Sequence, residues 1–232
     1  MHASSNNDIH GNTMTNNDIC IHLSNASDNS IYHNDFVNNT LQAQNIDSVN
    51  FWDIITLTEG NYWSDYNGFD ENGDRKGDTP YIIDENNQDN YPLIIPRGPI
   101  PFYWEEIRYD CIFDGNTTMS MLDFSHPSKS ISFDISLATK TGYFDVIVPR
   151  QLLDGHFKVL VANTPIAYML TWNQTYTSII LKLTIPPFSK NSIYNVKIIA
   201  DEVTPLIGDI NNDNCVDIFD VVLIANHFGE ES

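Results

Sequence analysis

The sequence predicts an all-β protein: rungs of a parallel β-solenoid, then an antiparallel β-sandwich, and finally a short calcium loop followed by a helix. Three observations lead to this prediction. Residues 1–57 repeat with a period of 22 and alternate short apolar runs with asparagine-rich corners. Residues 102–200 alternate apolar and polar side chains between turn signals. Two acidic stretches, within residues 60–84 and 206–232, have the spacing of calcium ligands.

The composition restricts the classes of function. The chain has 232 residues, a net charge of −20 and only 11 Lys and Arg residues, so no basic stripe exists to neutralise the phosphates of a nucleic acid. No run of about 18 apolar residues is present, so we expect no membrane insertion in this segment. An acidic, Asn- and Asp-rich composition fits an extracellular or cell-surface location, with an intracellular protein of a halophile as the alternative.

The N-terminus and the cysteines add little chemistry. The first residues show no signal peptide and already lie within a repeat, so we expect upstream rungs and a signal peptide in a longer parent chain. Cys20, Cys111 and Cys215 are far apart and odd in number, which predicts neither a disulfide framework nor a zinc site. Each is expected to be a small buried apolar residue.

The 22-residue period is visible when the N-terminal part is compared with itself. The shift aligns Asn7 with Asn29, Ile9 with Ile31, Asn12 with Asn34, Met14 with Phe36, Asn16 with Asn38 and Asn17 with Asn39. Asparagine suits the corners because it tolerates the left-handed conformation and bonds its own backbone. Asparagines at equivalent positions can also form side-chain ladders.

These rungs resemble the repeats of the NosD-like family, which is named for a periplasmic copper-maturation protein of nitrous-oxide reductase. The resemblance implies rungs of a right-handed parallel β-helix over residues 1–57, of a kind found in archaeal and bacterial surface proteins. The motifs NYWSDY, GDTPY and DNYPL resemble the segment that closes such arrays, here residues 58–96. Tyr62, Trp63 and Tyr66 are expected to cover the open end of the solenoid, with sugar stacking as the alternative.

The closing segment contains the first candidate calcium loop. Asp70, Asn72, Asp74 and Asp78 would bind through their side chains and Lys76 through its backbone carbonyl. The resembled segment usually has Gly at position 75, where this chain has Arg. The twelfth position is Tyr81 rather than an acid, so Asp84 or Asp65 would have to complete the shell. The alternative is a polar turn held by Asx hydrogen bonds.

Residues 97–101 read as a stiff linker, and residues 102–200 as seven or eight short strands of an immunoglobulin-like β-sandwich. The apolar runs that predict strands are Ile131–Leu137, Phe144–Val148, Phe157–Val161, Ile179–Ile185 and Ile193–Ile198. The aromatic side chains that could form a carbohydrate-binding face are Tyr103, Trp104, Tyr168, Trp172 and Tyr176. Packing in the core and at sheet edges is the more common use of such residues.

The C-terminal stretch, residues 206–232, carries the strongest calcium motif. The expected side-chain ligands are Asp209, Asn211, Asp213, Asp217 and Asp220, with the backbone carbonyl of Cys215. An amphipathic helix is predicted to follow. The motif resembles one dockerin repeat, a calcium-dependent module that docks on cohesins, although complete dockerins have two repeats. We expect it to pack against the sandwich; the alternative is a tail that binds a cohesin-like protein.

Three functions are compatible with the sequence. The first is a non-enzymatic, modular secreted or surface protein, rigidified by Ca²⁺, that serves adhesion, carbohydrate contact or envelope structure. The second is the C-terminal part of a polysaccharide-degrading hydrolase or lyase with a dockerin-like assembly module. The third is copper binding, which the family name suggests. It ranks last because His10, His22 and His33 do not share a repeat position and no ligand cluster has metal spacing.

Overall fold

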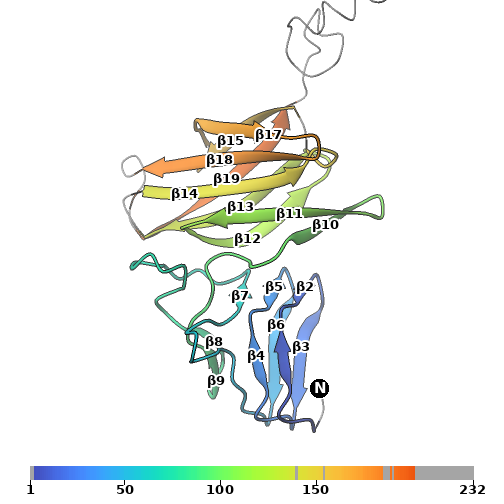
Figure 1. The fold of residues 1–232 in the computed structure, drawn as a ribbon, viewed down its shortest axis with the longest axis vertical. Helices are drawn as coiled ribbons and strands as arrows, with labels where there is room; N and C mark the ends of the chain where they lie inside the picture. The colour runs from blue at the N-terminus through green and yellow to red at the C-terminus, as the bar shows by residue number, and fades with distance from the viewer. Residues whose placement is uncertain (1–2, 139–140, 154, 185–188, 190, 202–232) are drawn as a thin grey trace, which may run out of the picture.

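The computed structural model describes residues 3–138, 141–153, 155–184, 189 and 191–201. This part of the chain is all-β and contains no helix, and therefore none that could span a membrane. Short parallel strands form the lower half of the molecule in Figure 1, and two larger antiparallel sheets form the upper half. The C-terminal calcium loop and its predicted helix lie outside the described residues.

Three parallel sheets form most of the lower half. Their strands are β1 (Asp8–His10), β2 (Thr13–Thr15), β3 (Ile19–Ser24), β4 (Ser30–Tyr32), β5 (Asp35–Val37), β6 (Leu41–Ile46) and β7 (Tyr62–Trp63). β1 pairs with β4, β2 with β5, and β3 with β6, each time with partners 22 residues apart, as in Ile9 with Ile31. The predicted 22-residue repeat is therefore confirmed.

Backbone conformation follows the same period. Positive φ angles recur at 3, 25 and 47, at 6 and 28, at 11 and 33, and at 16 and 38. Most of these positions hold Asn, Asp or Gly, which enter the left-handed region at lower cost than other residues. The asparagine-rich corners predicted from the sequence are therefore the points at which the chain turns from one strand to the next.

Asparagine side chains connect successive repeats. The backbone N–H of Asn7 donates to Oδ1 of Asn29 at 3.1 Å, and the side-chain amide of Asn7 donates to the same oxygen at 2.7 Å. The same pair of bonds joins Asn29 to Asn50. A second ladder runs through Asn12, Asn34 and Asn61. Because several members are fully buried, these bonds satisfy polar groups that water cannot reach.

Parallel stacking continues beyond residue 57, into the segment expected to cap the array. β7 pairs with β5, and an isolated bridge places Leu93 parallel to Tyr62. The remaining two strands, β8 (Tyr81–Asp84) and β9 (Asn87–Asp89), form an antiparallel hairpin. The segment thus adds a further layer to the stack and covers it at the same time.

The aromatic residues of this segment are buried. Trp63 stacks on Phe36 with ring centroids 4.4 Å apart and on Tyr81 at 4.1 Å. The Tyr66 hydroxyl donates to the carbonyl of Thr79 at 2.8 Å, and Tyr62 is fully buried. Burial agrees with the predicted covering role and leaves none of the three rings exposed for sugar stacking.

The upper half consists of two five-stranded antiparallel sheets, with orders β10-β11-β14-β18-β17 and β12-β13-β19-β15-β16. Their strands are β10 (Ile100–Trp104), β11 (Ile107–Gly115), β12 (Thr118–Ser125), β13 (Ser130–Leu137), β14 (Thr141–Pro149), β15 (His156–Val161), β16 (Thr164–Pro165), β17 (Tyr168–Trp172), β18 (Tyr176–Thr184) and β19 (Ser192–Asp201). The described part therefore has more strands than the seven or eight expected. The additional ones include the two-residue β16 and β10, which begins inside the predicted linker.

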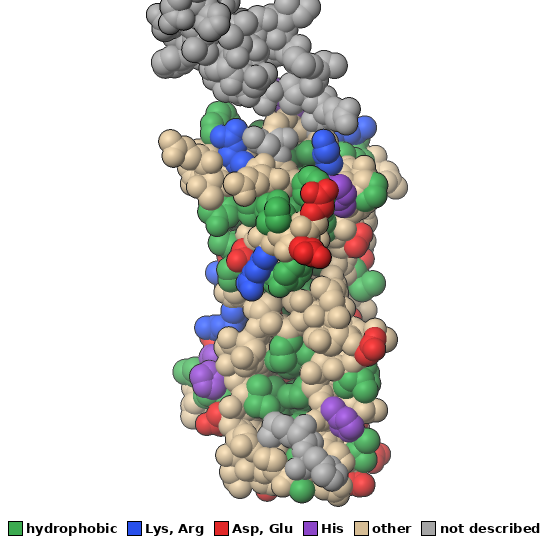
Figure 2. Space-filling model, turned by 90° about the vertical axis from the view of Figure 1, so that its right-hand side faces the viewer, with side chains coloured by type: hydrophobic (Ala, Val, Ile, Leu, Met, Phe, Trp, Pro, Cys, Tyr) green, Lys and Arg blue, Asp and Glu red, His purple; other side chains and the backbone are tan. Residues whose placement is uncertain are grey.

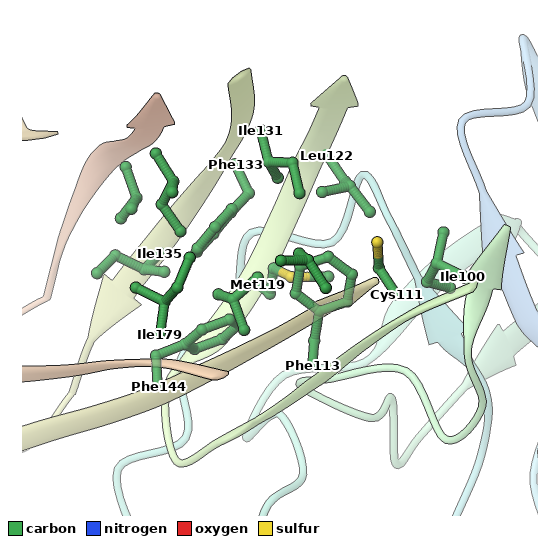
Figure 3. Packing of buried hydrophobic residues seen from close by; sticks show 14 of the residues in the cluster. Ile100, Cys111, Phe113, Met119, Leu122, Ile131, Phe133, Ile135, Phe144 and Ile179 are labelled. Carbon is green, nitrogen blue, oxygen red and sulfur yellow. The ribbon is translucent and has the colours of Figure 1, made fainter. Parts of the chain in front are cut away.

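Buried side chains from both sheets form one core. Figure 3 shows Phe113 and Phe144 of one sheet directed toward Met119 and Phe133 of the other. Where the structure describes their side chains, the alternating apolar residues of the predicted runs are buried, except that Ile193 is 46% exposed. The strand predicted over Ile193–Ile198 is confirmed as part of β19, in which Val196 and Ile198 face the core. Cys111 is buried as expected and Cys20 only half-buried.

The two halves share this core. Val37, Tyr62 and Ile94 of the lower half belong to the same hydrophobic cluster as the sheet residues. Hydrogen bonds also cross the junction: the side-chain amide of Asn38 donates to the carbonyl of Leu122 at 2.6 Å. Residues 97–101, expected to form a linker, are held as well, because Asp35 binds the first two and Ile100 begins β10.

Candidate ligand cleft and calcium loop

A cleft of about 470 Å³ lies where the two halves meet. Four segments line it: the turn before β7, the candidate calcium loop, the chain that connects the halves, and β11. The lining residues are Glu59, Asp74, Arg75, Lys76, Leu93, Ile95, Pro96, Arg97, Ile112, Phe113 and Asp114. In Figure 2, Lys and Arg side chains of the visible face lie at mid-height and at the upper end, and its lower part shows none.

Acidic and basic side chains alternate in the cleft. Arg75 pairs with Asp114, Lys76 lies 3.4 Å from Asp74, and Arg97 donates to Glu59 at 3.0 Å. The Nε2 atom of His33 also lies 2.7 Å from Glu59. Most of these groups are a third to a half exposed, so each pair contributes little to stability but leaves charged groups accessible.

Two buried aspartates fix the backbone of the two arginines. Asp70, 3% exposed, accepts the backbone N–H of Arg75 at 2.9 Å. Asp35, 2% exposed, accepts the N–H groups of Arg97 and Gly98, both at 2.9 Å. Burial raises the pKa of both carboxyls, and the backbone hydrogen bonds act in the opposite direction. The backbone of both arginines is therefore fixed by hydrogen bonds to buried carboxylates.

Asp114 joins the cleft to the outer surface of a sheet. It accepts a hydrogen bond from the Tyr143 hydroxyl at 3.1 Å in addition to its pair with Arg75. Partial burial alone would raise the pKa of Asp114, but these two donors lower it below its usual value. The carboxylate therefore stays charged and accepting over the physiological pH range.

The candidate calcium loop folds around Asp70. Its Oδ1 accepts the N–H groups of Gly73 and Asp74 at 2.7 and 3.1 Å. Asn72 accepts the N–H of Asp74 at 2.8 Å and Asp74 that of Lys76 at 3.1 Å. These are the Asx-type hydrogen bonds expected of a polar turn, which was the alternative to a calcium loop. A polar turn and a calcium loop are compatible, because short oxygen-bearing side chains also make such turns in calcium loops.

The remaining expected ligands are only partly brought together. Asp78 accepts from the side chain of Asn72 at 3.2 Å and so belongs to the loop. Asp65 instead accepts from the Tyr81 hydroxyl at 3.1 Å, and Asp84 from the side chain of Asn87 at 2.8 Å. Within the described residues no group of three His, Cys, Asp or Glu side chains is placed to hold a metal ion. Calcium at this loop therefore stays a prediction.

Arg75 has a positive φ of 70°. This conformation explains why the resembled segment usually has Gly at the position where this chain has Arg. Glycine tolerates this conformation without steric cost, whereas an L-residue pays for it. The arginine is held there by the Asp70 bond described above, and its side chain reaches into the cleft.

Copper ligands are not gathered in the described part of the chain. His10 stacks on the ring of Tyr32 with centroids 5.2 Å apart, and His33 lies against Glu59. The soft and imidazole ligands that copper prefers do not converge among these residues. The donor set therefore does not fit a copper centre.

The proposed aromatic ligand face is dispersed. Tyr103 in β10 and Trp172 in β17 are 60% and 69% exposed, but they lie on the two opposite edge strands of one sheet. Trp104 packs on His126 with ring centroids 3.9 Å apart, and the Tyr168 hydroxyl donates to the carbonyl of Phe157. The calcium ligands predicted at Asp209–Asp220 lie outside the described residues.

Sequence reasoning missed the cleft. One signal was available, since residues 1–107 contain only three cations, Arg75, Lys76 and Arg97, and all three line it. The sequence could not identify Glu59 and Asp114 as the partners of Arg97 and Arg75, because each ion pair joins residues about 40 positions apart.

Comparison with known proteins finds a family match in the N-terminal part of the chain. Residues 1–68 match the family model described as periplasmic copper-binding protein (NosD). The match covers the parallel strands β1–β7 and ends before the candidate calcium loop. No curated protein and no solved structure matches the chain. The likeness fits a repeat protein of the periplasm or the cell surface, and it is limited to the lower half of the molecule.

Proposed function

We propose that this chain is a non-enzymatic structural module of the periplasm or cell surface, in which a right-handed parallel β-helix carries an immunoglobulin-like sandwich in a fixed orientation. The observation that carries the proposal is the continuity of the contacts across the junction. Two asparagine ladders run through the lower half, and its last layer shares a hydrophobic core with both upper sheets. The family match to residues 1–68 supports the location and the repeat.

A fixed orientation follows from the kind of contact at the junction. Domains joined by small polar interfaces move relative to each other, whereas a large apolar interface holds them together. Here Tyr62 is fully buried in the common core and donates to the carbonyl of Met119 at 3.2 Å. Backbone bonds also cross, from Met119 to Ile94 at 2.8 Å and from Met121 to Ser64 at 2.7 Å. Such a module suits adhesion or envelope structure, where a binding surface must be held away from its support.

We further propose that Ca²⁺ stiffens this module at Asp70–Asp78 and at Asp209–Asp220. The support is the spacing of oxygen-bearing side chains at both places. At the first loop it is also that Asp70, Asn72 and Asp78 accept or donate hydrogen bonds within the turn that contains Asp74. Calcium ions are available outside the cell, which agrees with the proposed location.

Calorimetry of the whole chain tests the structural role. We expect one cooperative unfolding transition for the two halves, and a shift of that entire transition when Asn34 is replaced by Ala. Asn34 is fully buried, and its side chain bonds Ile9, Tyr32 and Asn61. Asn86→Ala, at an exposed position outside the ladders, is the matched control and should leave the transition unchanged. Two separate transitions, of which the one for the upper half does not respond to Asn34→Ala, would show that the halves unfold independently.

A further inference from the structure

We infer that the junction cleft is a binding site for a carboxylated saccharide, that is, a uronic-acid unit of a polysaccharide. The inference goes beyond the structural role proposed above and does not depend on it. It rests on the charges that the cleft collects, on the weakness of the ion pairs that hold them, and on the fixed backbone at two arginines.

The charge distribution is unusual for this chain. The net charge is −20, yet the first three cations of the sequence, Arg75, Lys76 and Arg97, line one cleft. Arginine presents a planar set of N–H donors that matches a carboxylate in a bidentate fashion. A carboxylated ligand would therefore find here the only such group of cations in residues 1–107.

The existing ion pairs do not block the site. Arg97 and its partner Glu59 are 47% and 34% exposed, and Arg75 and Asp114 are 54% and 46% exposed. Exposed pairs of this kind are worth little in water, so a ligand carboxylate can take over guanidinium N–H groups at low cost. The freed carboxylates can then accept hydrogen bonds from sugar hydroxyls.

The rest of the lining suits a sugar ring. Ile112, 39% exposed, offers apolar surface to the C–H face of a pyranose, and the buried residues Leu93, Ile95 and Pro96 line the cleft next to the charged groups. A volume of about 470 Å³ is in the range of small-molecule sites. Apolar area together with a few directed polar groups is the usual composition of such sites.

The backbone at the two arginines is fixed in advance of binding. The buried carboxylates of Asp70 and Asp35 hold the backbone N–H groups of Arg75 and Arg97, each at 2.9 Å. Arg75 moreover has a φ of 70°, a conformation that an arginine adopts at a steric cost. Backbone strain that is held by surrounding bonds is concentrated at functional sites. Preorganisation of this kind improves affinity because less entropy is lost on binding.

Calorimetric titration of the full chain with trigalacturonate tests the inference, with the uncharged oligosaccharide galactotriose as the comparison ligand. We expect saturable binding of trigalacturonate at one site, weakened by added salt because the recognition is ionic. Arg75→Gln and Arg97→Gln should each weaken it about tenfold or more, since a hydrogen bond to a charged group is worth about that factor. The comparison ligand should bind at least about tenfold more weakly for the same reason.

The matched control is Arg108→Gln. Arg108 donates to Asp110 at 2.8 Å and is 56% exposed, so it resembles Arg75 in exposure and pairing but lies outside the cleft. The Arg108→Gln variant should bind trigalacturonate with the same affinity as the wild type. Arg75→Gly is a second variant, because it removes the side chain and also relieves the positive φ, so that lost binding cannot be attributed to misfolding. Absence of binding, equal binding of the two ligands, or equal losses in Arg108→Gln and Arg97→Gln would each overturn the inference.

Discussion

The Asp89 carboxylate accepts the backbone N–H of Asn61 at 2.7 Å, and so ends a ladder that asparagines form everywhere else. One step earlier, Asn34 donates in the same way to the side-chain oxygen of Asn61 at 3.0 Å. Unlike an asparagine side chain, the carboxylate has no N–H that could donate to a next member of the ladder. It accepts further hydrogen bonds from the Trp63 indole at 2.9 Å and from the backbone N–H of Tyr91 at 3.0 Å. A fully buried acceptor group therefore stops the ladder where the repeat ends.

Stability should depend on pH through Asp89. Burial raises the pKa of this carboxyl to about 7, although hydrogen bonds from Asn61, Trp63 and Tyr91 lower it. Because the pKa in the folded state exceeds the unfolded value, the folded state binds the proton more tightly. The contribution of Asp89 to stability is therefore present at low pH and is lost as the pH rises from about 4 to about 7.

Denaturant titrations of the wild type and of Asp89→Asn across this pH range test the prediction. The asparagine variant cannot titrate, so its stability relative to the wild type should improve steadily as the pH rises toward about 7 and then level off. Asp8→Asn, which changes an exposed aspartate of β1, should leave the wild-type pH dependence in place. Parallel pH curves for the wild type and Asp89→Asn would contradict the prediction.

Gly60 should tolerate no side chain because Asp89 fills the space beside it. A Cβ atom at position 60 would lie 1.8 Å from Oδ1 of Asp89, which is a hard overlap. We expect Gly60→Ala to lower the free energy of unfolding by about 3 kcal/mol, the upper part of the usual range for overpacking. Gly11→Ala is the comparison, since Gly11 has open space but a φ of 70° and should lose only about 1 kcal/mol.

A double-mutant cycle identifies the cause of the Gly60 effect. If the overlap with Asp89 is responsible, Gly60→Ala should cost much less in an Asp89→Ala background than in the wild type. Chemical denaturation of the four proteins gives the coupling free energy directly. Additive losses would mean that Gly60 is required for another reason.

The repeat could be predicted because residues at a constant separation of 22 are visible in the sequence itself. A shift of 22 residues aligns Asn12 with Asn34, and in the structure the same two residues are joined by a side-chain hydrogen bond. The end of the ladder could not be predicted, because Asn61 and Asp89 are 28 residues apart and break the period. The strand over Ile193–Ile198 was predicted from its apolar residues, but Ile193 and Val196 are an odd number of positions apart, so Val196 faces the core and Ile193 is exposed.

The junction and the cleft were invisible for a related reason. Tyr62 meets Met119 across 57 residues, and Asn38 meets Leu122 across 84, with no pattern in the sequence to connect them. Residues 97–101 looked like a linker because Gly and Pro are frequent there. The buried carboxylate that holds Arg97 and Gly98 belongs to Asp35, whose role only the folded chain reveals.

Ile94 should couple the stability of the two halves. Its side chain is fully buried in the common core, and its carbonyl accepts the N–H of Met119 at 2.8 Å. Ile94→Ala should cost about 2–5 kcal/mol, as expected for a large-to-small change in a packed core. Hydrogen exchange should then become faster in β5 and in β12 alike. Ile82→Ala, at a position that is 60% exposed, should change neither. Faster exchange in only one half would show that the core does not transmit the loss.

Calcium should raise the melting temperature of the full chain. A ligand at about 100 times its dissociation constant adds about 2.7 kcal/mol per site. For a chain of this size, each kcal/mol corresponds to roughly 2–4 °C. Calorimetry in EDTA and in excess Ca²⁺, with Mg²⁺ as the control ion, measures the shift. Equal melting temperatures in EDTA and Ca²⁺ would remove calcium from the account of this protein.

Two variants assign the effect to one loop or the other. Asp74→Asn retains the oxygen that accepts the N–H of Lys76 and removes only the charge, so the turn itself should survive. Asp213→Asn makes the same change in the C-terminal motif. We expect each variant to lose part of the calcium-dependent shift and the double variant to lose all of it, because a carboxylate ligand contributes charge that an amide does not. If Asp74→Asn keeps the full shift while Asp213→Asn abolishes it, the loop around Asp70 is an Asx turn alone, and its oxygens serve only to hold Arg75 at the cleft.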